Sequence, residues 1–152
     1  MSDNGREREE CFMKRTAVTV VEILIVLILV GISAAVIVPH TRFKELTSDL
    51  RSIRANLELY RVAHDAYPNG VTDTLWVAQL TGRTDKDGTL NESGAYGPYI
   101  STFPVNPFNG NGQVLLDDGS HDPGEIFTGV GWYFNTSTGR FAPNDSRDHG
   151  RL

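Results

Sequence analysis

The sequence contains a single cysteine, Cys11, and therefore no cysteine pair that would form a disulfide or a paired-cysteine metal site. It also lacks a phosphate-binding glycine loop and the nucleophile elbow of hydrolases. The four histidines are scattered, with none at a helical metal-ligand spacing: His40, His64, His121 and His149. Because no catalytic motif is present, we expect that the protein is not an enzyme.

Basic residues are fewer than acidic residues in this sequence. The chain has 14 Lys and Arg against 19 Asp and Glu, and its net charge is −5. Nonspecific binding of nucleic acid depends on Lys and Arg that neutralise phosphates. We therefore expect no nucleic-acid partner.

Long apolar runs are rare too, with one exception at residues 18–38, which read VTVVEILIVLILVGISAAVIV. About 20 apolar residues suffice to cross a bilayer. Lys14 and Arg15 precede the run and Pro39 ends it. Glu22 is its only charge, and a carboxylate at mid-membrane costs roughly 3 kcal/mol on insertion scales. Glu22 therefore either has a functional partner or lies near the interface, where its side chain reaches water.

The residues around this run resemble the class III signal of type IV pilins and type II secretion pseudopilins. That signal has a short basic leader, a small residue at the cut, a hydrophobic residue and often Thr after it, and a glutamate as the fifth mature residue. These positions are filled here by Lys14-Arg15, Ala17, Val18, Thr19 and Glu22, and Pro39 stands where many members carry a proline. The family usually has Gly before the cut and Phe or Met after it, so two positions depart from the pattern.

The resemblance implies processing and assembly. A prepilin peptidase would cut between Ala17 and Val18, and the freed amine of Val18 would be N-methylated. That amine would then meet Glu22 of an adjacent subunit in a helical filament. Thr19 and Pro39 are the other residues that the resemblance assigns to assembly.

The same resemblance divides the chain into four segments. Residues 1–17 would be a leader, although Met13 begins a compact basic leader of its own and is an alternative start. Residues 18–39 would form a transmembrane helix before assembly and the filament core afterwards. Residues 40–142 would be a periplasmic pilin-like domain, and the polar residues 143–152 a flexible tail.

Beyond the proline, the spacing of apolar residues predicts that the helix continues. One stripe recurs at steps of three and four and consists of Phe43, Leu46, Leu50, Ile53, Leu57 and Tyr60. His64 is placed to continue it. A short helix is predicted at 72–81, with Thr72 or Asp73 as its cap and Gly82 as its stop.

Closely spaced strands are predicted at 113–116, 126–128, 131–134 and 140–142, with a turn at 135–139. Short strands joined by tight turns favour an antiparallel sheet. The predicted fold class is therefore α+β and pilin-like, with a long N-terminal helix, half transmembrane and half amphipathic, packed on a small antiparallel β-sheet.

One loop is rich in carboxylates: Asp117, Asp118, Asp122 and Glu125. Major pseudopilins often hold calcium in a C-terminal loop, and such a site needs six to eight oxygen ligands. The spacing does not fit an EF-hand, so calcium and a plain solvated turn both remain open. No other cofactor is expected.

Taken with the resemblance, the sequence predicts a structural filament subunit, a pseudopilin of a type II secretion system. A pilin of a type IV or competence pilus, for adhesion or DNA uptake, is the alternative, followed by a membrane-anchored periplasmic binding domain. The predicted partners are other copies of the chain, prepilin peptidase, an inner-membrane assembly platform and minor pseudopilins. The protein would cross the bacterial inner membrane once, with its N-terminus cytoplasmic and its C-terminal domain periplasmic, and its filament would lie in the periplasm or at the cell surface.

Overall fold

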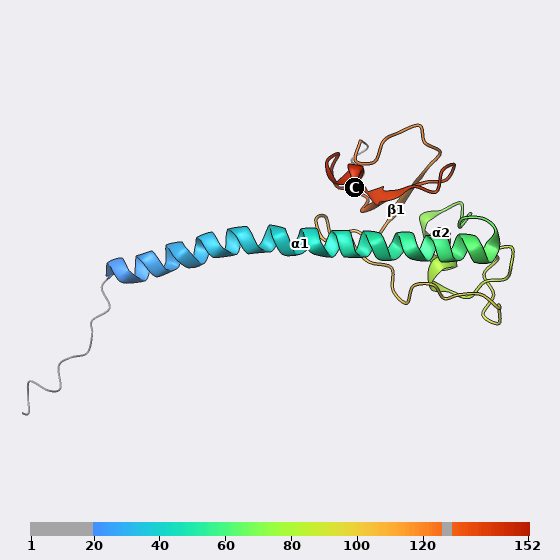
Figure 1. Cartoon of the computed structure of the whole chain (residues 1–152), viewed down its shortest axis with the longest axis horizontal. Coiled ribbons are helices and arrows are strands. Elements are labelled where there is room, and N and C mark those ends of the chain that lie inside the picture. Colours follow the sequence, from blue (N-terminus) through green and yellow to red (C-terminus); the bar gives the residue numbers. More distant parts are fainter. Residues whose placement is uncertain (1–19, 126–128) are drawn as a thin grey trace, which may run out of the picture. The chain divides into compact units, whose positions relative to one another are not determined.

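The computed structural model describes residues 20–125 and 129–152, and for residues 33–39 it describes the backbone alone. The elements in chain order are α1 (Val20–His64), α2 (Asp73–Thr81), β1 (Val114–Asp117), β2 (Trp132–Asn135), β3 (Phe141–Pro143) and a short 3-10 helix, η1 (His149–Arg151) (Figure 1). The chain divides into two compact units, Met1–Pro39 and His40–Leu152. The predicted α+β class is confirmed.

The C-terminal part of α1 buries the predicted apolar stripe. Its buried members are at most 3% exposed: Leu46, Leu50, Ile53, Leu57 and Tyr60. Phe43 was predicted to belong to the stripe but is 41% exposed, because the core cluster begins only at Leu46. This spacing of three and four residues keeps one face of the helix turned toward the rest of the domain.

His64 continues the stripe as predicted, and its ring is buried among polar partners. Nε2 lies 3.0 Å from the hydroxyl of Tyr99 and 3.2 Å from Oγ1 of Thr84, and Nδ1 lies 3.0 Å from the carbonyl oxygen of Lys86. The ring also stacks on Tyr60, with centroids 4.0 Å apart. Because both ring nitrogens have partners, this histidine joins α1 to residues 84–99 as part of the core.

The short helix α2 has the boundaries that its sequence predicts. The Oγ1 of Thr72 accepts a hydrogen bond from the backbone N–H of Leu75 at 3.3 Å, which caps the N-terminus. Gly82 follows the last turn, and its N–H donates to the carbonyl of Ala78. Trp76 and Leu80 of this helix are fully buried in the core.

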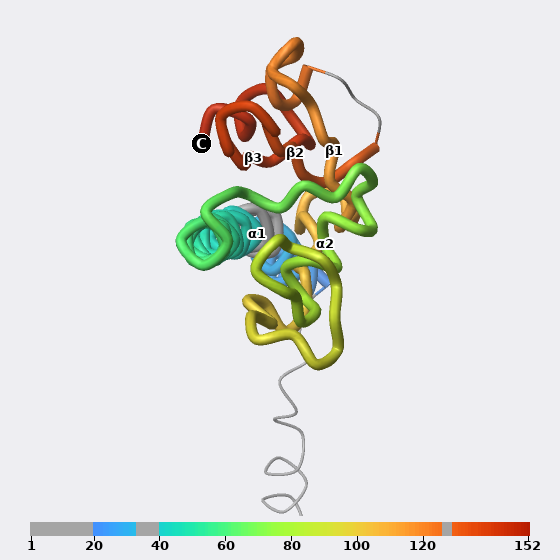
Figure 2. The backbone as a smooth tube through the Cα atoms, turned by 90° about the vertical axis from the view of Figure 1, so that its right-hand side faces the viewer, coloured from blue at the N-terminus to red at the C-terminus, as the bar shows by residue number. Residues whose placement is uncertain are grey.

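The three strands lie in the order β1-β2-β3, side by side in Figure 2. The pair β2–β3 is antiparallel, but β1 runs parallel to β2, with Val114 opposite Trp132. The predicted all-antiparallel sheet is therefore wrong, and the sheet is mixed. A parallel pair needs a connection of about a dozen residues or more, and residues 118–131 are long enough to provide one. The strand predicted at 126–128 lies outside the described residues.

The core is dominated by aromatic side chains that join the helices to the sheet. Trp76 of α2 lies against Phe134 and Phe141, with ring centroids 4.8 Å and 6.1 Å apart. Trp132 stacks on Phe141 at 5.3 Å. Arg54 of α1 donates two hydrogen bonds to the carbonyl of Phe141, at 2.9 and 2.7 Å. These contacts hold the domain together without a disulfide, as the lack of cysteine requires.

Residues 143–152, predicted as a flexible tail, are packed against the domain. Asn144 is 2% exposed, and its Oδ1 accepts a hydrogen bond from the N–H of Gly124 at 2.7 Å. The carbonyl of Gly150 accepts from Arg140 at 2.7 Å. The polar composition misled the prediction, because these side chains bond to the fold rather than to water.

Within the described part of the chain, no helix has both the length and the apolarity needed to cross a membrane.

Candidate assembly surface

The first turns of α1 present apolar side chains to the surroundings on every face. The large hydrophobic residues of this segment are 49–75% exposed: Val20, Val21, Ile23, Leu24, Ile25, Val26, Leu27, Ile28, Leu29, Val30 and Ile32. A helix that is apolar all round is normally buried in protein or lipid. Contiguous apolar surface of this extent marks an interaction site. We call Val20–Ile32 the apolar segment.

Glu22 is the only charged residue of the apolar segment and lies in the first turn of α1, where it is exposed. The assembly role of Glu22 stays a prediction.

The other residues predicted to act in cleavage and assembly are not described by the structure, or are described by their backbone alone. Ala17, Val18 and Thr19 fall within the undescribed residues 1–19, so the cleavage and methylation positions are not seen. Pro39 lies inside α1, which continues as one helix to His64, and its side chain is not described.

The carboxylates predicted as calcium ligands are engaged separately within the domain. Asp117 contacts Nδ1 of His121 at 2.9 Å and accepts from the N–H of Gly119 at 2.7 Å and from the hydroxyl of Tyr133 at 3.3 Å. Burial raises the pKa of Asp117, but these hydrogen bonds outweigh it and leave the pKa below its usual value. Asp118 accepts from the N–H of Ser120.

The other two acids of the set, Asp122 and Glu125, have different partners. Glu125 accepts from the N–H of Asp122 at 3.2 Å and forms a long ion pair with Arg147 at 3.6 Å. Among the described residues, no three acidic, histidine or cysteine side chains are grouped to hold a metal ion. The four carboxylates thus bond to separate partners, and calcium binding stays a prediction.

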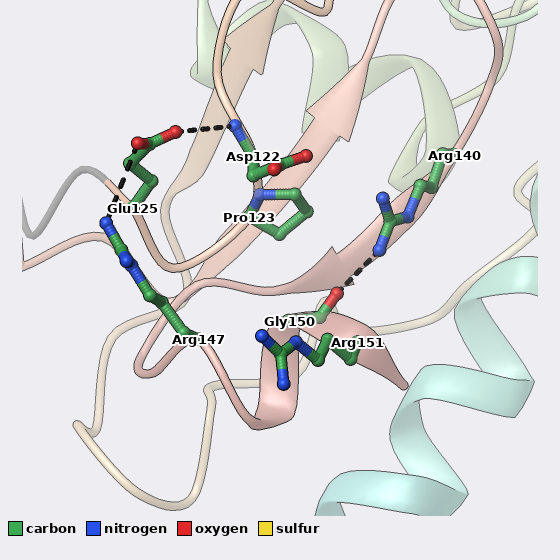
Figure 3. Close-up of a pocket in the computed structure, with 7 residues that line it drawn as sticks. All are labelled: Asp122, Pro123, Glu125, Arg140, Arg147, Gly150 and Arg151. Atoms are coloured by element: carbon green, nitrogen blue, oxygen red, sulfur yellow. Dashed lines mark hydrogen bonds and ion pairs between the residues drawn. The ribbon is translucent and has the colours of Figure 1, made fainter.

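Three arginines that sequence reasoning missed converge near these acids. Arg140, Arg147 and Arg151 line a cavity of about 230 Å³ together with Asp122 and Glu125 (Figure 3). They come from the turn before β3, the loop after it and η1, and their spacing in sequence follows no helical or strand period. Only the folding of residues 140–151 brings them together, so no sequence signal was available to find them. We call this feature the arginine cavity.

The chain is similar to one type of protein in several bacteria. Type II secretion system core protein G of Pseudomonas aeruginosa is 24% identical over 122 residues, which cover 76% of this chain and 82% of that protein. The proteins of the same name from Vibrio cholerae and Escherichia coli are 25% identical over 122 residues and 23% identical over 121. These alignments cover 76% and 71% of this chain, and 80% and 76% of the relatives.

No family model matches the chain, and no solved structure matches it. The similarities are distant but agree with one another and extend well beyond the N-terminal motif on which the sequence prediction rested. Together with that motif they support the resemblance to type II secretion pseudopilins that the sequence predicts.

Proposed function

We propose that this protein is a structural filament subunit of a type II secretion system, processed by prepilin peptidase and assembled through its N-terminal helix. The observation that carries the proposal is the apolar segment, whose side chains are exposed on all faces of α1 around a single charge, Glu22. The similarity to core protein G supports the same role.

Transfer of the apolar segment from water into an apolar environment is energetically favourable. Full burial of one Val, Leu or Ile side chain contributes about 1.5–3 kcal/mol, so a segment of this kind does not remain in water. Lipid and the helices of neighbouring subunits are both apolar, and small residues such as Gly31 permit close approach of helices. Residues 18–39 would therefore lie in the inner membrane before assembly and in the filament core afterwards.

Glu22 supplies a means of setting the register between subunits. Cleavage before Val18 would create an amine that pairs with Glu22 of a neighbouring copy. An ion pair in a low dielectric contributes little net stability, but a misplaced subunit would leave both charges unpaired. The pair would therefore select one axial position of each incoming subunit.

The basic residues before the apolar run indicate how the helix would be oriented in the membrane. Lys14 and Arg15 precede the apolar run, and basic residues keep their end of a membrane helix on the cytoplasmic side. The domain that follows would then lie in the periplasm, with prepilin peptidase, an assembly platform and minor pseudopilins as partners.

A pilin of a type IV or competence pilus is the second candidate, because its N-terminal motif is shared. The names of the relatives favour secretion, and the net charge of −5 disfavours capture of DNA. A membrane-anchored periplasmic binding domain explains the apolar run but gives no role to Glu22.

Processing is tested by the intact mass of the protein extracted from membranes. We expect a chain that begins at Val18, with the mass of one methyl group added. A chain that still carries Met1 or Met13 in assembled material would contradict the processing step, and a cleaved chain without the extra mass would contradict only the methylation.

The role of Glu22 is tested by comparing filament yield with the amount of processed subunit in the membrane. Glu22→Ala should leave insertion and cleavage intact but reduce filament yield roughly tenfold or more, since an unpaired amine in apolar surroundings costs a few kcal/mol. Glu22→Gln should be intermediate, because it keeps a hydrogen-bond acceptor without the charge. Glu92→Ala, an exposed acid of a loop, is the matched control. Normal filament yield from Glu22→Ala would show that the residue is not part of assembly.

A further inference from the structure

The arginine cavity contains guanidinium groups that are not fully neutralised by the two acids that also line it. Arg147 reaches Glu125 only at 3.6 Å, and the second oxygen of Glu125 is occupied by the N–H of Asp122. Arg140 donates to the carbonyl of Gly150, which is neutral. Within the described part of the chain, neither Arg140 nor Arg151 forms an ion pair.

A further arginine lies near Arg140. Arg54 lies close by on α1, and its pKa is lowered by burial and then by the positive charge of Arg140. An anion that entered the cavity would relieve this repulsion. A guanidinium group is suited to bind a carboxylate through two parallel hydrogen bonds, and among the described residues the Arg140 guanidinium donates to the carbonyl of Gly150.

A complementary pair of acids lies on α1. Glu45 is exposed and Asp49 is half-buried, one helical turn apart. Like charges at this spacing destabilise a helix, and neither residue forms an ion pair with a described residue. Burial and the charge of Glu45 raise the pKa of Asp49, so the carboxylate would gain from a cation.

We propose that the arginine cavity receives the Glu45–Asp49 carboxylate pair of a second copy of the chain. The inference rests on the proposed function as a filament subunit and names one of the contacts between subunits. The Cβ atoms of two residues at this spacing lie about 5–6 Å apart on a helix surface. The cavity of about 230 Å³ is lined by three arginines and two acids, so its net positive charge favours a carboxylate.

The two surfaces differ from each other, and this has a consequence for assembly. Glu45 and Asp49 lie on α1, whereas the cavity is built from residues 122–151. Two copies could pair these surfaces reciprocally in a closed two-fold dimer, or each copy could offer its acid pair to one neighbour and its cavity to another. Only the second, head-to-tail arrangement generates rings or open helical filaments, and it is the arrangement that a filament subunit requires.

Charge reversal tests the contact in full-length protein. Arg147→Glu with Arg151→Glu should reduce filament yield roughly tenfold or more, since like charges across an interface cost several kcal/mol. Glu45→Arg with Asp49→Arg should do the same. The four substitutions together should restore the yield to within about twofold. Failure of the combined variant to recover, with normal amounts of processed subunit, would overturn the inference.

Cross-linking gives a second test that does not depend on charge reversal. In a Cys11→Ser background, a bismaleimide reagent should join Asp49→Cys in one copy to Arg151→Cys in another in assembled filaments, since a contact between carboxylate and guanidinium side chains separates the Cα atoms further than a disulfide spans. Asp49→Cys paired with Glu92→Cys is the control and should not cross-link. Filaments of the Asp49→Cys and Arg151→Cys copies without the expected cross-link would overturn this contact but leave the filament function intact. Absence of any filament from the wild-type chain would overturn the proposed function itself.

Discussion

Removal of the Asn106 side chain is the perturbation whose effect the structure defines most closely. Asn106 is fully buried immediately before the turn at 107–109. Its Nδ2 donates to the carbonyl of Gly131 at 2.9 Å and to Oδ1 of Asp145 at 2.7 Å, and its Oδ1 accepts from the N–H of Phe108 at 2.9 Å. One amide thus connects the turn, the residue before β2 and the C-terminal residues.

Asn106→Ala would remove one hydrogen-bond partner from each of three groups: the carbonyl of Gly131, the carboxylate of Asp145 and the N–H of Phe108. A buried polar group that loses its hydrogen bond costs about 1–3 kcal/mol. Asp145 keeps its contact with Nδ1 of His149, and the carbonyl of Gly131 still accepts from the N–H of Asn144, so the cost at these two groups falls at the lower end of that range. We therefore expect the free energy of unfolding to fall by about 2–4 kcal/mol, a large part of the roughly 5–15 kcal/mol that a domain possesses.

Denaturant unfolding of the detergent-solubilised full chain measures this change. Asn109→Ala is the matched control, because Asn109 is exposed and donates to the carbonyl of Val130 at 3.2 Å. The control should lose no more than about 1 kcal/mol. A loss below about 1 kcal/mol for Asn106→Ala, or equal losses for the two variants, would refute the view that this amide organises the C-terminal half of the domain.

Two further predictions concern the loop after β1 and the cap of α2. The Asp117 carboxylate hydrogen-bonded to His121 raises the pKa of His121 above its ordinary value of 6.5. Its stabilising effect should be complete below about pH 6.5 and disappear as the pH rises through the folded-state pKa. NMR titration measures that pKa, and Asp117→Asn should lower it; an unchanged value would argue against the contact. Thr72→Ala should lower the free energy of unfolding by about 1 kcal/mol through loss of the N-cap, whereas Thr74→Ala should stay within about 0.5 kcal/mol of the wild type. Equal losses in denaturant unfolding would show that the Thr72 cap does not stabilise α2.

The elements that depend on local chemistry were predictable from the sequence. The spacing of Leu46, Leu50 and Leu57 identified the buried face of α1, because helical periodicity and burial coincide there. Thr72 and Gly82 marked the ends of α2, because a cap hydrogen bond is formed within a few residues of chain. The apolar run around Glu22 is likewise a local pattern, and it carries the resemblance and the proposed assembly surface.

Features that depend on distant residues were not predictable. The parallel pairing of β1 with β2 depends on the path of residues 118–131, which local propensity does not define. The packing of residues 143–152 depends on partners such as Gly124, which lies 20 residues away from Asn144. The direction of a strand and the burial of polar C-terminal residues both depend on contacts between residues that are far apart in the sequence.

The sequence by itself determined the apolar segment, its glutamate and the amphipathic helix, since each is a pattern within a few turns of chain. Only the tertiary structure decided that the acids predicted for calcium are divided between separate partners. It also decided that Arg140, Arg147 and Arg151 share one cavity. The physical reason is that charge interactions depend on distance in space, and folding brings together residues whose spacing in the chain carries no periodic signal.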